Sequence, residues 1–396
     1  MSTLTLPQAT DYDVIICGAG PVGLSVAALL QQRSTPLTPA PRIALIDAKP
    51  ADAASHDPRT LALSHGSQQI LQKISAWPFM ATTATPIHQI HVSRRQYFGR
   101  TLIQRDDYQL QALGYVVRYG PLVTALSSAL SSFSDQSTLT ILRPAQVAAI
   151  DEQDWQVNVQ LTDGRSLSAG IVVQAEGGVF SEQAAKTVQR DYDQIAIIAH
   201  IRCSQRIAHR AFERFTSEGP LALLPQEDGY ALVWCVRPIT ATRLLALDDQ
   251  AFLAELGTTF GERLGRFVAT SPRHSYPLGL NATSAASART VAIGNAAQTL
   301  HPVAGQGLNL GLRDAMVLVR TLAQHGAGPA ALTQFARLRH HDRQATITLT
   351  DLMARAFTGA PDGSLAQTLL GMSLGLIDVA APAKRALAEQ MIFGWR

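Results

Sequence analysis

Charged side chains are scarce in this sequence of 396 residues, since Asp, Glu, Lys and Arg together contribute 16% of it, against roughly 25% in an ordinary globular protein. Hydrophobic residues reach 46%, which excludes a disordered chain or a highly charged filament and predicts a large buried core. Cysteine is limited to Cys17, Cys203 and Cys235, with no CxxC spacing among them. A disulfide framework and a thiolate zinc site are therefore excluded, and we expect three partly buried thiols in a reducing cytosol.

Neither sign of charge dominates, and long apolar runs are also missing. The net charge is +3, which is too small to indicate a nucleic-acid partner. No stretch approaches the roughly 18 to 20 apolar residues that cross a bilayer, and residues 1–13 do not resemble a signal peptide. We therefore expect a cytoplasmic protein, whose length predicts two or three domains at about 150 residues each.

The chain opens with the pattern of a βαβ unit. Residues 13–17 are a continuous, β-branched apolar run, which is typical of a buried strand. A glycine-rich turn and a helix-like segment from Pro21 to about Gln32 follow, and a second apolar run spans residues 43–46. Strand, turn, helix and strand in this order predict an α/β fold that begins with a doubly wound domain.

Strand-like segments dominate the middle of the chain. Residues 155–161 and 167–173 flank a turn, and longer runs at 195–201 and 230–236 predict a second, mainly antiparallel sheet. A strand at 289–294 and a helix from about Gly307 to His325 then return to the doubly wound style, and the last sixty residues look helical.

The first glycine-rich turn matches a dinucleotide fingerprint. In residues 18–23, GAGPVG, Gly18 permits the tight turn, Gly20 lets a pyrophosphate approach the backbone, and Gly23 lets the helix pack on the strand. Pro21 begins the helix, and Asp47 closes the second strand, where a carboxylate can hold the ribose hydroxyls of an adenosine. This spacing does not separate FAD from NAD.

A second glycine-rich stretch favours a flavin. Residues 291–315 read VAIGNAAQTLHPVAGQGLNLGLRDA, which is the end of a strand, a polar turn and a glycine loop that opens a helix. Such a loop offers free N–H groups and the positive end of a helix dipole to an anion, such as the pyrimidine edge of a reduced flavin. A glycine loop that only packs two elements together is the alternative.

Together the two motifs resemble those of the class A flavoprotein aromatic hydroxylases, and in particular the ubiquinone-biosynthesis hydroxylases of the 2-octaprenyl-6-methoxyphenol type. Further similar stretches lie at residues 59–64, 90–93, 113–117 and 214–225, so the resemblance spans about residues 13 to 345. It implies a Rossmann-like FAD-binding domain with an inserted, mainly antiparallel β-sheet substrate domain and a helical C-terminus. The FAD-binding domain would comprise residues 1–80, 105–185 and 285–335, the substrate domain 81–104 and 186–284, and the helical region 336–396.

The resemblance also implies roles for matching residues. The ADP half of FAD would be held by Gly18, Gly20, Pro21, Gly23 and Asp47, and Asn295 stands where most of the family has an aspartate that bonds the ribityl chain. An asparagine can still accept and donate hydrogen bonds there. The residues implied to line the isoalloxazine are Pro302, Gly305, Gln306 and Gly307, with Asn309 beside the pyrimidine ring. The other residues implied to bind the cofactor are Gly294, Leu308, Arg59 and Glu176.

The implied catalytic set is Arg59, Pro302, Gly305 and Gln306. Arg59 matches a family arginine that approaches the flavin, with a surface arginine paired to Asp57 as the alternative interpretation. The implied chemistry is reduction of bound FAD by NADPH or NADH, capture of O2 as a C4a-hydroperoxyflavin, and oxygen transfer to a polyprenylated phenol. A prenyl-lipid reductase that consumes no O2, and an FAD-binding scaffold of a ubiquinone-synthesis complex, are the alternatives.

The sequence departs from the family pattern at the middle motif. Glu176 stands where the family has an aspartate that serves FAD and NADPH, and no arginine follows it closely, Lys186 being the nearest base. Arg94 and Arg118 occupy positions where relatives tend to be acidic. No second dinucleotide fingerprint is present, in agreement with a family that lacks a separate nicotinamide domain.

Three further features have a structural interpretation. His301 is expected to make a structural hydrogen bond, and His340 and His341, among Arg337, Arg339 and Arg343, are expected on a solvated helix face, because no metal-ligand partners are suitably spaced. Apolar stripes at residues 365–376 and 387–395 predict core or helix–helix contacts. The minority interpretation is a partner-binding helix or peripheral contact with the inner membrane.

Overall fold

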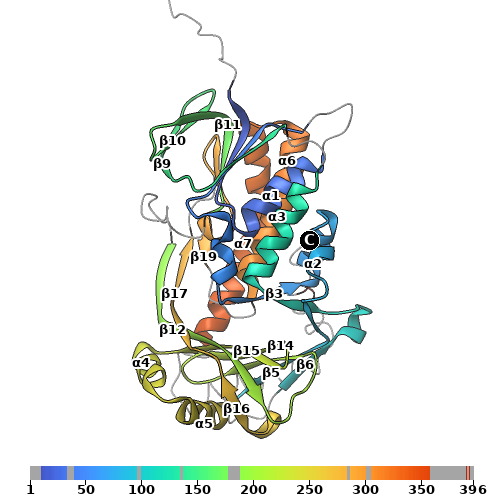
Figure 1. The fold of residues 1–396 in the computed structure, drawn as a ribbon, viewed down its shortest axis with the longest axis vertical. Coiled ribbons are helices and arrows are strands. Elements are labelled where there is room, and N and C mark those ends of the chain that lie inside the picture. The colour runs from blue at the N-terminus through green and yellow to red at the C-terminus, as the bar shows by residue number, and fades with distance from the viewer. Residues whose placement is uncertain are drawn as a thin grey trace, which may run out of the picture.

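The computed structural model describes residues 10–33, 40–95, 100–133, 137–176, 188–282, 286–299 and 305–356, with residues 389 and 392. These residues form three sheets and the helices that pack on them (Figure 1). Among the described helices, none combines the length and the apolar character that a membrane span requires.

The first sheet is built around the predicted βαβ unit, in the order β8-β2-β1-β11-β10-β9, with β18 beside β11. Its strands are β1 (Tyr12–Cys17), β2 (Ile43–Ile46), β8 (Leu139–Leu142), β9 (Val147–Glu152), β10 (Val157–Leu161), β11 (Ser166–Gln174) and β18 (Thr290–Ala292). The neighbours β8, β2, β1, β11 and β18 are parallel, whereas β9 and β10 are antiparallel additions. Residues 14–17 and 43–46 are buried throughout, which explains why these strands are continuously apolar.

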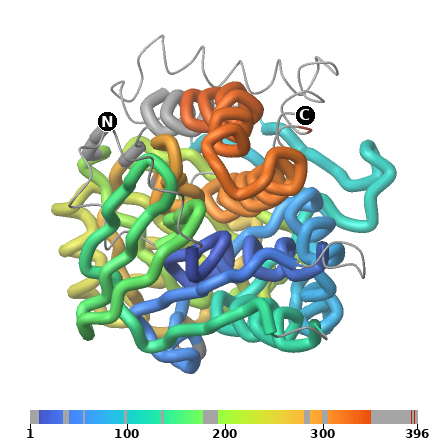
Figure 2. Tube along the Cα trace, turned by 90° about the horizontal axis from the view of Figure 1, so that it is seen from above, coloured from blue at the N-terminus to red at the C-terminus, as the bar shows by residue number. Residues whose placement is uncertain are grey.

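Three helices lie side by side against one face of this sheet: α1 (Pro21–Gln31), α3 (Tyr119–Ser131) and α6 (Gln306–His325) (Figure 1). Leu24, Leu126 and Leu318 contribute to this core. The helix α7 (Pro329–Ala356) packs on α6, and Figure 2 shows the two at one side of the molecule. Helix α7 runs unbroken across residues 335 and 336, where the predicted helical region begins, and Phe335 is buried in the same core.

The second sheet has the order β19-β17-β12-β15-β14-β13-β5-β6, with β16 beside β12. Its strands are β5 (Gln89–Arg94), β6 (Arg100–Gln104), β12 (Val188–Cys203), β13 (Arg210–Phe215), β14 (Pro220–Gln226), β15 (Gly229–Val236), β16 (Phe267–Thr270), β17 (His274–Ala282) and β19 (Gln298–Thr299). All neighbours are antiparallel except β5 and β13. Two helices that the sequence interpretation did not include, α4 (Pro238–Ala246) and α5 (Asp249–Phe260), cover one face.

A small third sheet connects the two large ones. It consists of β3 (Thr60–Ser64), β7 (Gly114–Arg118) and β4 (Thr85–Ile87), with α2 (His65–Lys73) following β3. Ile87 and Val116 of this sheet pack against Ala211 of β13. Short 3-10 helices lie at Ala51–His56, Trp77–Phe79, Arg105–Tyr108, Glu262–Leu264 and Gly294–Ala296.

Candidate functional site

The glycine turn between β1 and α1 has no room for a side chain at Gly18 or Gly23. Gly18 has φ +105°, and a Cβ on it would lie 2.8 Å from the carbonyl carbon of Ala175. A Cβ on Gly23 would lie 1.8 Å from the Gly18 oxygen, so the absence of a side chain lets α1 pack on the turn. Gly20 is the N-cap, and no side chain caps the helix. The first N–H groups of α1 are thus available to an anion.

Two carboxylates flank this turn, at the carboxyl ends of the strands on either side of β1. Asp47, after β2, accepts hydrogen bonds from the backbone N–H of Ala19 at 2.6 Å and of Lys49 at 2.7 Å. Glu176, after β11, has a buried Oε2 atom that no described residue hydrogen-bonds. Burial, and then the charge of Asp47, raise the pKa of Glu176 to about 7. A buried carboxyl oxygen without a donor fits a site that a polar ligand completes.

Arg59 forms an ion pair with Asp57, as the alternative interpretation of this arginine predicts. Its Nη2 lies 2.6 Å from Oδ2 of Asp57, and its Nε contacts both carboxylate oxygens. The guanidinium also stacks at 4.5 Å over the ring of Tyr119. The Tyr119 hydroxyl in turn lies 3.4 Å from where a Cβ of Gly20 would be. Arg59 is therefore linked to Asp57 and, through Tyr119, to the glycine turn.

The second glycine motif meets the first in space. Gly294, at φ +59°, begins a 3-10 helix, and a Cβ on it would lie 3.1 Å from Val22 Cγ2 in the first turn of α1. Asn295 is exposed, and its Oδ1 lies 3.9 Å from where a Cβ of Gly307 would be. The N-termini of α1 and α6 thus border the same place, although their motifs are more than 270 residues apart.

The start of α6 combines a left-handed cap with a fully bonded asparagine. Gly305 is the N-cap at φ +60°, and no side chain of the described residues caps α6. The Asn309 amide donates to the carbonyls of Ala62 and Gly305, and its oxygen accepts from Ser64 N at 2.9 Å and Ser67 Oγ at 2.7 Å. Its side chain is therefore used within the protein, and it fixes the α6 cap to β3.

The remaining predicted residues of this loop divide into two groups. Gln306 is buried, and Leu308 packs against the main core. Pro302 and His301 lie outside the described residues, as do Lys186 and the named residues of the two C-terminal stripes.

A buried ionic cluster behind this loop corrects the interpretation of α7. His340 and His341 are exposed as expected, but Arg339 and Arg343, placed with them on a solvated face, are buried. Helices α6 and α7 contribute five charged side chains to this cluster: Arg313, Asp314, Arg339, Asp342 and Arg343. In the sequence, Arg339, Asp342 and Arg343 alternate in charge at helical spacing, and this pattern could have indicated ion pairs rather than a solvated face.

The cluster is connected to the second glycine motif. Arg339 Nε donates to Asp314 at 2.6 Å, and Asp314 accepts a second hydrogen bond at 3.3 Å from Gln298, next to the Gly294 turn. Arg343 donates to the carbonyl of Ala292, at the end of β18, at 3.3 Å. The charges therefore hold the two ends of the turn onto α6 and α7.

The nine-stranded sheet has two unlike faces. The register places Val92, Glu213, Ala222, Val233 and Ile198 in one row across five strands. All five are partly exposed. The side chains of the other face, including Phe212, Leu223 and Leu232, are buried under α4 and α5. We call the face that carries the row of five the open face.

The open face is directed toward the two glycine motifs. Gln226, on this face, accepts a hydrogen bond at 3.3 Å from Thr60 of β3. Ala62, two residues along β3, is the neighbour of Gly305, since a Cβ on that glycine would lie 3.0 Å from the Ala62 Cβ. The strand β19, which follows the Gly294 turn, is itself part of the same sheet. Figure 1 shows α4 and α5 on the opposite side of the sheet from α1, α3 and α6.

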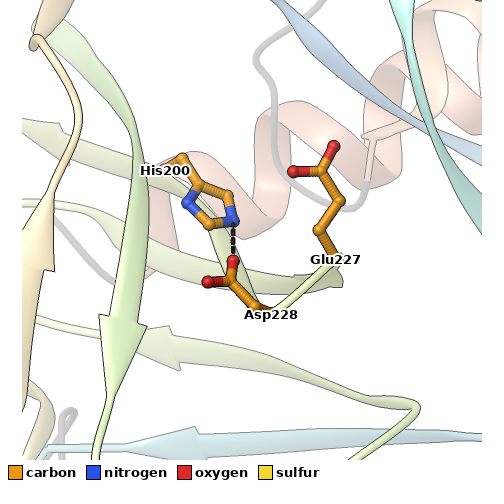
Figure 3. Close-up of side chains that lie close together, drawn as sticks. All are labelled: His200, Glu227 and Asp228. Atoms are coloured by element: carbon orange, nitrogen blue, oxygen red, sulfur yellow. Dashed lines mark ion pairs between the residues drawn. The ribbon is translucent and has the colours of Figure 1, made fainter.

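Near one end of the open face, His200, Glu227 and Asp228 gather (Figure 3). Their ligand-type atoms lie within 4.8 Å of one another. The Glu227 carboxylate is already held by Arg118 at 2.8 and 3.0 Å, and Arg202 lies 3.8 Å from Asp228. The arginines balance the carboxylates, so the group is explained as an ion-pair cluster rather than as a metal site.

Comparison with known proteins agrees with this geometry. The family model described as FAD binding domain matches residues 11–350. Ubiquinone hydroxylase UbiL of Rhodospirillum rubrum is 31% identical, over 94% of this chain and 87% of that protein. The mitochondrial ubiquinone biosynthesis monooxygenase COQ6 of Xenopus tropicalis is 28% identical, over 79% of this chain and 78% of that protein.

Solved structures show the same fold. Klebsiella pneumoniae HpxO, in complex with FAD and uric acid, superimposes with a TM-score of 0.74 over 99% of each chain at 14% identity. The α/β fold with an antiparallel second sheet, predicted from the sequence, is thereby confirmed.

Proposed function

Because the chain belongs to the family of FAD-binding flavoprotein monooxygenases, we propose that it hydroxylates the ring of a polyprenylated phenol in ubiquinone biosynthesis. NADPH or NADH is the reductant and O2 the oxidant in this proposal. The names of the relatives support the pathway, since UbiL is a ubiquinone hydroxylase and COQ6 a ubiquinone biosynthesis monooxygenase.

The residues around the first glycine motif fit the ADP half of FAD. Gly18, Gly20 and Gly23 leave the backbone free of side chains at the uncapped N-terminus of α1, which suits a pyrophosphate. Asp47 is held in place by two backbone N–H groups and would receive the ribose hydroxyls. The unpartnered oxygen of Glu176 supports a polar group of the cofactor as its missing partner.

The second motif would hold the isoalloxazine. Asn295 would bond the ribityl chain, and the backbone from Gly305 to Gly307 at the uncapped start of α6 would face the ring. When bound, FAD supplies the redox chemistry that activates O2. The chain contributes a fixed anion-stabilising helix N-terminus, held by Asn309 and by the buried ionic cluster.

The open face is the observation that supports a prenylated substrate. Four of its five central side chains are hydrocarbon, namely Val92, Ala222, Val233 and Ile198, and all remain partly exposed next to the cofactor motifs. Covering such a surface with a hydrocarbon chain stabilises the complex by about 0.8 kcal/mol per buried CH2 group. A small polar substrate would leave this surface in contact with water.

Other parts of the proposal come from the family resemblance of the sequence. NADPH or NADH would bind transiently, because the chain carries a single dinucleotide fingerprint. Membership of a ubiquinone-synthesis complex stays a proposal. So does contact of the apolar stripes at residues 365–376 and 387–395 with the cytoplasmic side of the inner membrane, and apart from residues 389 and 392 the residues of these stripes lie outside the described part of the chain.

The experiment that tests the pathway is a profile of quinone intermediates, by mass spectrometry, in an aerobic strain that lacks the gene. We expect a prenylphenol short of one hydroxyl group to accumulate, and its mass names the substrate. An unchanged profile would refute the assignment to ubiquinone biosynthesis. Substrate turnover by the purified protein without O2 uptake would instead favour a prenyl-lipid reductase.

A further inference from the structure

Glu213 is the carboxylate in the central row of the open face. It lies in β13, with Val92 of β5 on one side and Ala222 of β14 on the other. Both neighbours are hydrocarbon, and beyond Ala222 the row continues with Val233 and Ile198. The remainder of this row is the surface on which we place the prenylphenol, so the carboxyl group is positioned to meet the polar end of that molecule.

The described residues give Glu213 no partner of their own. None of them donates a hydrogen bond to its carboxyl group or forms an ion pair with it, although the side chain is partly exposed. Two titratable neighbours lie on the same face. One is Cys235, and its pKa is raised by burial and then by the charge of Glu213. The other is Arg94, which is buried and lies two residues along β5 from Val92. A carboxyl group that lies between hydrocarbon side chains, and to which no described residue donates, is open to a polar group of a bound ligand.

We propose that the Glu213 carboxylate is the catalytic base that accepts the phenolic proton of the substrate. The inference rests on the function proposed above. In the step, the phenol O–H bond breaks, its electron pair stays on the oxygen, and the proton forms an O–H bond to Glu213. The resulting phenolate makes the ring electron-rich for oxygen transfer. After oxygen transfer, the hydroxylated ring carbon releases its hydrogen as a proton to the solvent and the ring becomes aromatic again. The proton held by Glu213 returns to the phenolic oxygen, which restores the carboxylate.

The environment of Glu213 suits this exchange. Burial raises the pKa of its carboxyl group to about 8, closer to the value of about 10 that is typical of a phenol than an ordinary glutamate would be. A base accepts a proton more efficiently when its pKa approaches the pKa of the proton donor. The carboxylate form grows as the pH rises through about 8, so kcat/KM for an un-ionised phenol should rise over the same range.

The test compares the FAD-loaded wild type with Glu213→Gln, which keeps the size of the side chain and removes the base. The substrates are 2-prenylphenol and a polyfluorinated analogue whose hydroxyl is ionised at the assay pH, with NADPH and O2. We expect Glu213→Gln to lose about 100- to 10,000-fold in kcat/KM on 2-prenylphenol and to lose its rise near pH 8. The wild-type-to-variant ratio should shrink strongly on the ionised analogue, which needs no base.

Three controls separate this role from a structural one. Glu255→Gln makes the same change on the exposed side of α5, and the rise in kcat/KM with pH should remain in this variant. The FAD content of each variant reports folding, and Glu213→Asp, which keeps an acid, should retain part of the activity and the pH dependence. Equal rates for Glu213→Gln and wild type on 2-prenylphenol, or an equal defect on both substrates, would overturn the role of Glu213 alone. Absence of hydroxylation by the FAD-loaded wild type would overturn the proposed function as well.

Discussion

Replacing Asp314 with asparagine should destabilise the protein by several kcal/mol without changing the size of the side chain. Asp314 is fully buried, and Arg339, whose Nε bonds it at 2.6 Å, is 4% exposed. The cluster contains three arginines and two aspartates, so the substitution leaves the buried Arg339 and Arg343 and the largely buried Arg313 with one carboxylate. Breaking a buried ion pair by removing one partner costs about 3–5 kcal/mol, because the remaining charge stays desolvated.

The assay is thermal unfolding of the FAD-free protein, followed by circular dichroism. At about 2–4 °C per kcal/mol for a large domain, the melting temperature should fall by roughly 6–20 °C. Asp249→Asn is the matched control, since Asp249 pairs with Arg273 at 3.3 Å but is 69% exposed, and its loss should cost about 0–1 kcal/mol. If Asp314→Asn melted within the range of this control, the cluster would not contribute to stability as argued.

Two further predictions concern the cofactor site. Gly23→Ala should abolish FAD retention through gel filtration, because its Cβ would lie 1.8 Å from the Gly18 oxygen. Gly328→Ala is the control and should retain FAD, since no atom lies within 4 Å of its Cβ. Equal FAD content in the two variants would contradict the close packing of the turn. Burial and Asp47 raise the pKa of Glu176 to about 7, so its protonated form is favoured by folding, and the FAD-free wild type should lose stability as the pH rises from about 4.5 to 7. Glu176→Gln should lose less over that range in urea titrations, and an identical pH dependence would show that Glu176 is not buried as described.

The local features of the fold could be predicted from the sequence, and the long-range ones could not. The strand at residues 13–17 and the turn from Gly18 to Gly23 can be recognised in the sequence, because strand burial and tight turns are encoded within a few neighbouring residues. The helices α4 and α5 were missed although their starts carry signals, namely Pro238 in the first turn and Asp248, whose side chain accepts a hydrogen bond from Ala251 N.

The sequence patterns did not identify residues whose roles depend on partners from other helices and strands. Arg339 and Arg343 look like a basic surface until α6 brings Asp314 to them. Glu213 and Phe212 are neighbours in β13 and point to opposite faces of the sheet. Only the strand register shows that Glu213 is the one on the open face. Asn309, which we expect beside the flavin, also bonds through its side chain to β3, α2 and the α6 cap. Contacts across more than 200 residues of chain leave no local periodicity to detect.

The central claim is that this protein transfers one oxygen atom from O2 to a prenylated phenol. The most direct measurement is incubation of the purified, FAD-loaded protein with 2-prenylphenol and NADPH under ¹⁸O2, followed by mass spectrometry of the product. We predict a dihydroxy product that carries one ¹⁸O atom, formed in proportion to the NADPH consumed. NADPH oxidation that yields only hydrogen peroxide, or a product without ¹⁸O, would contradict the account.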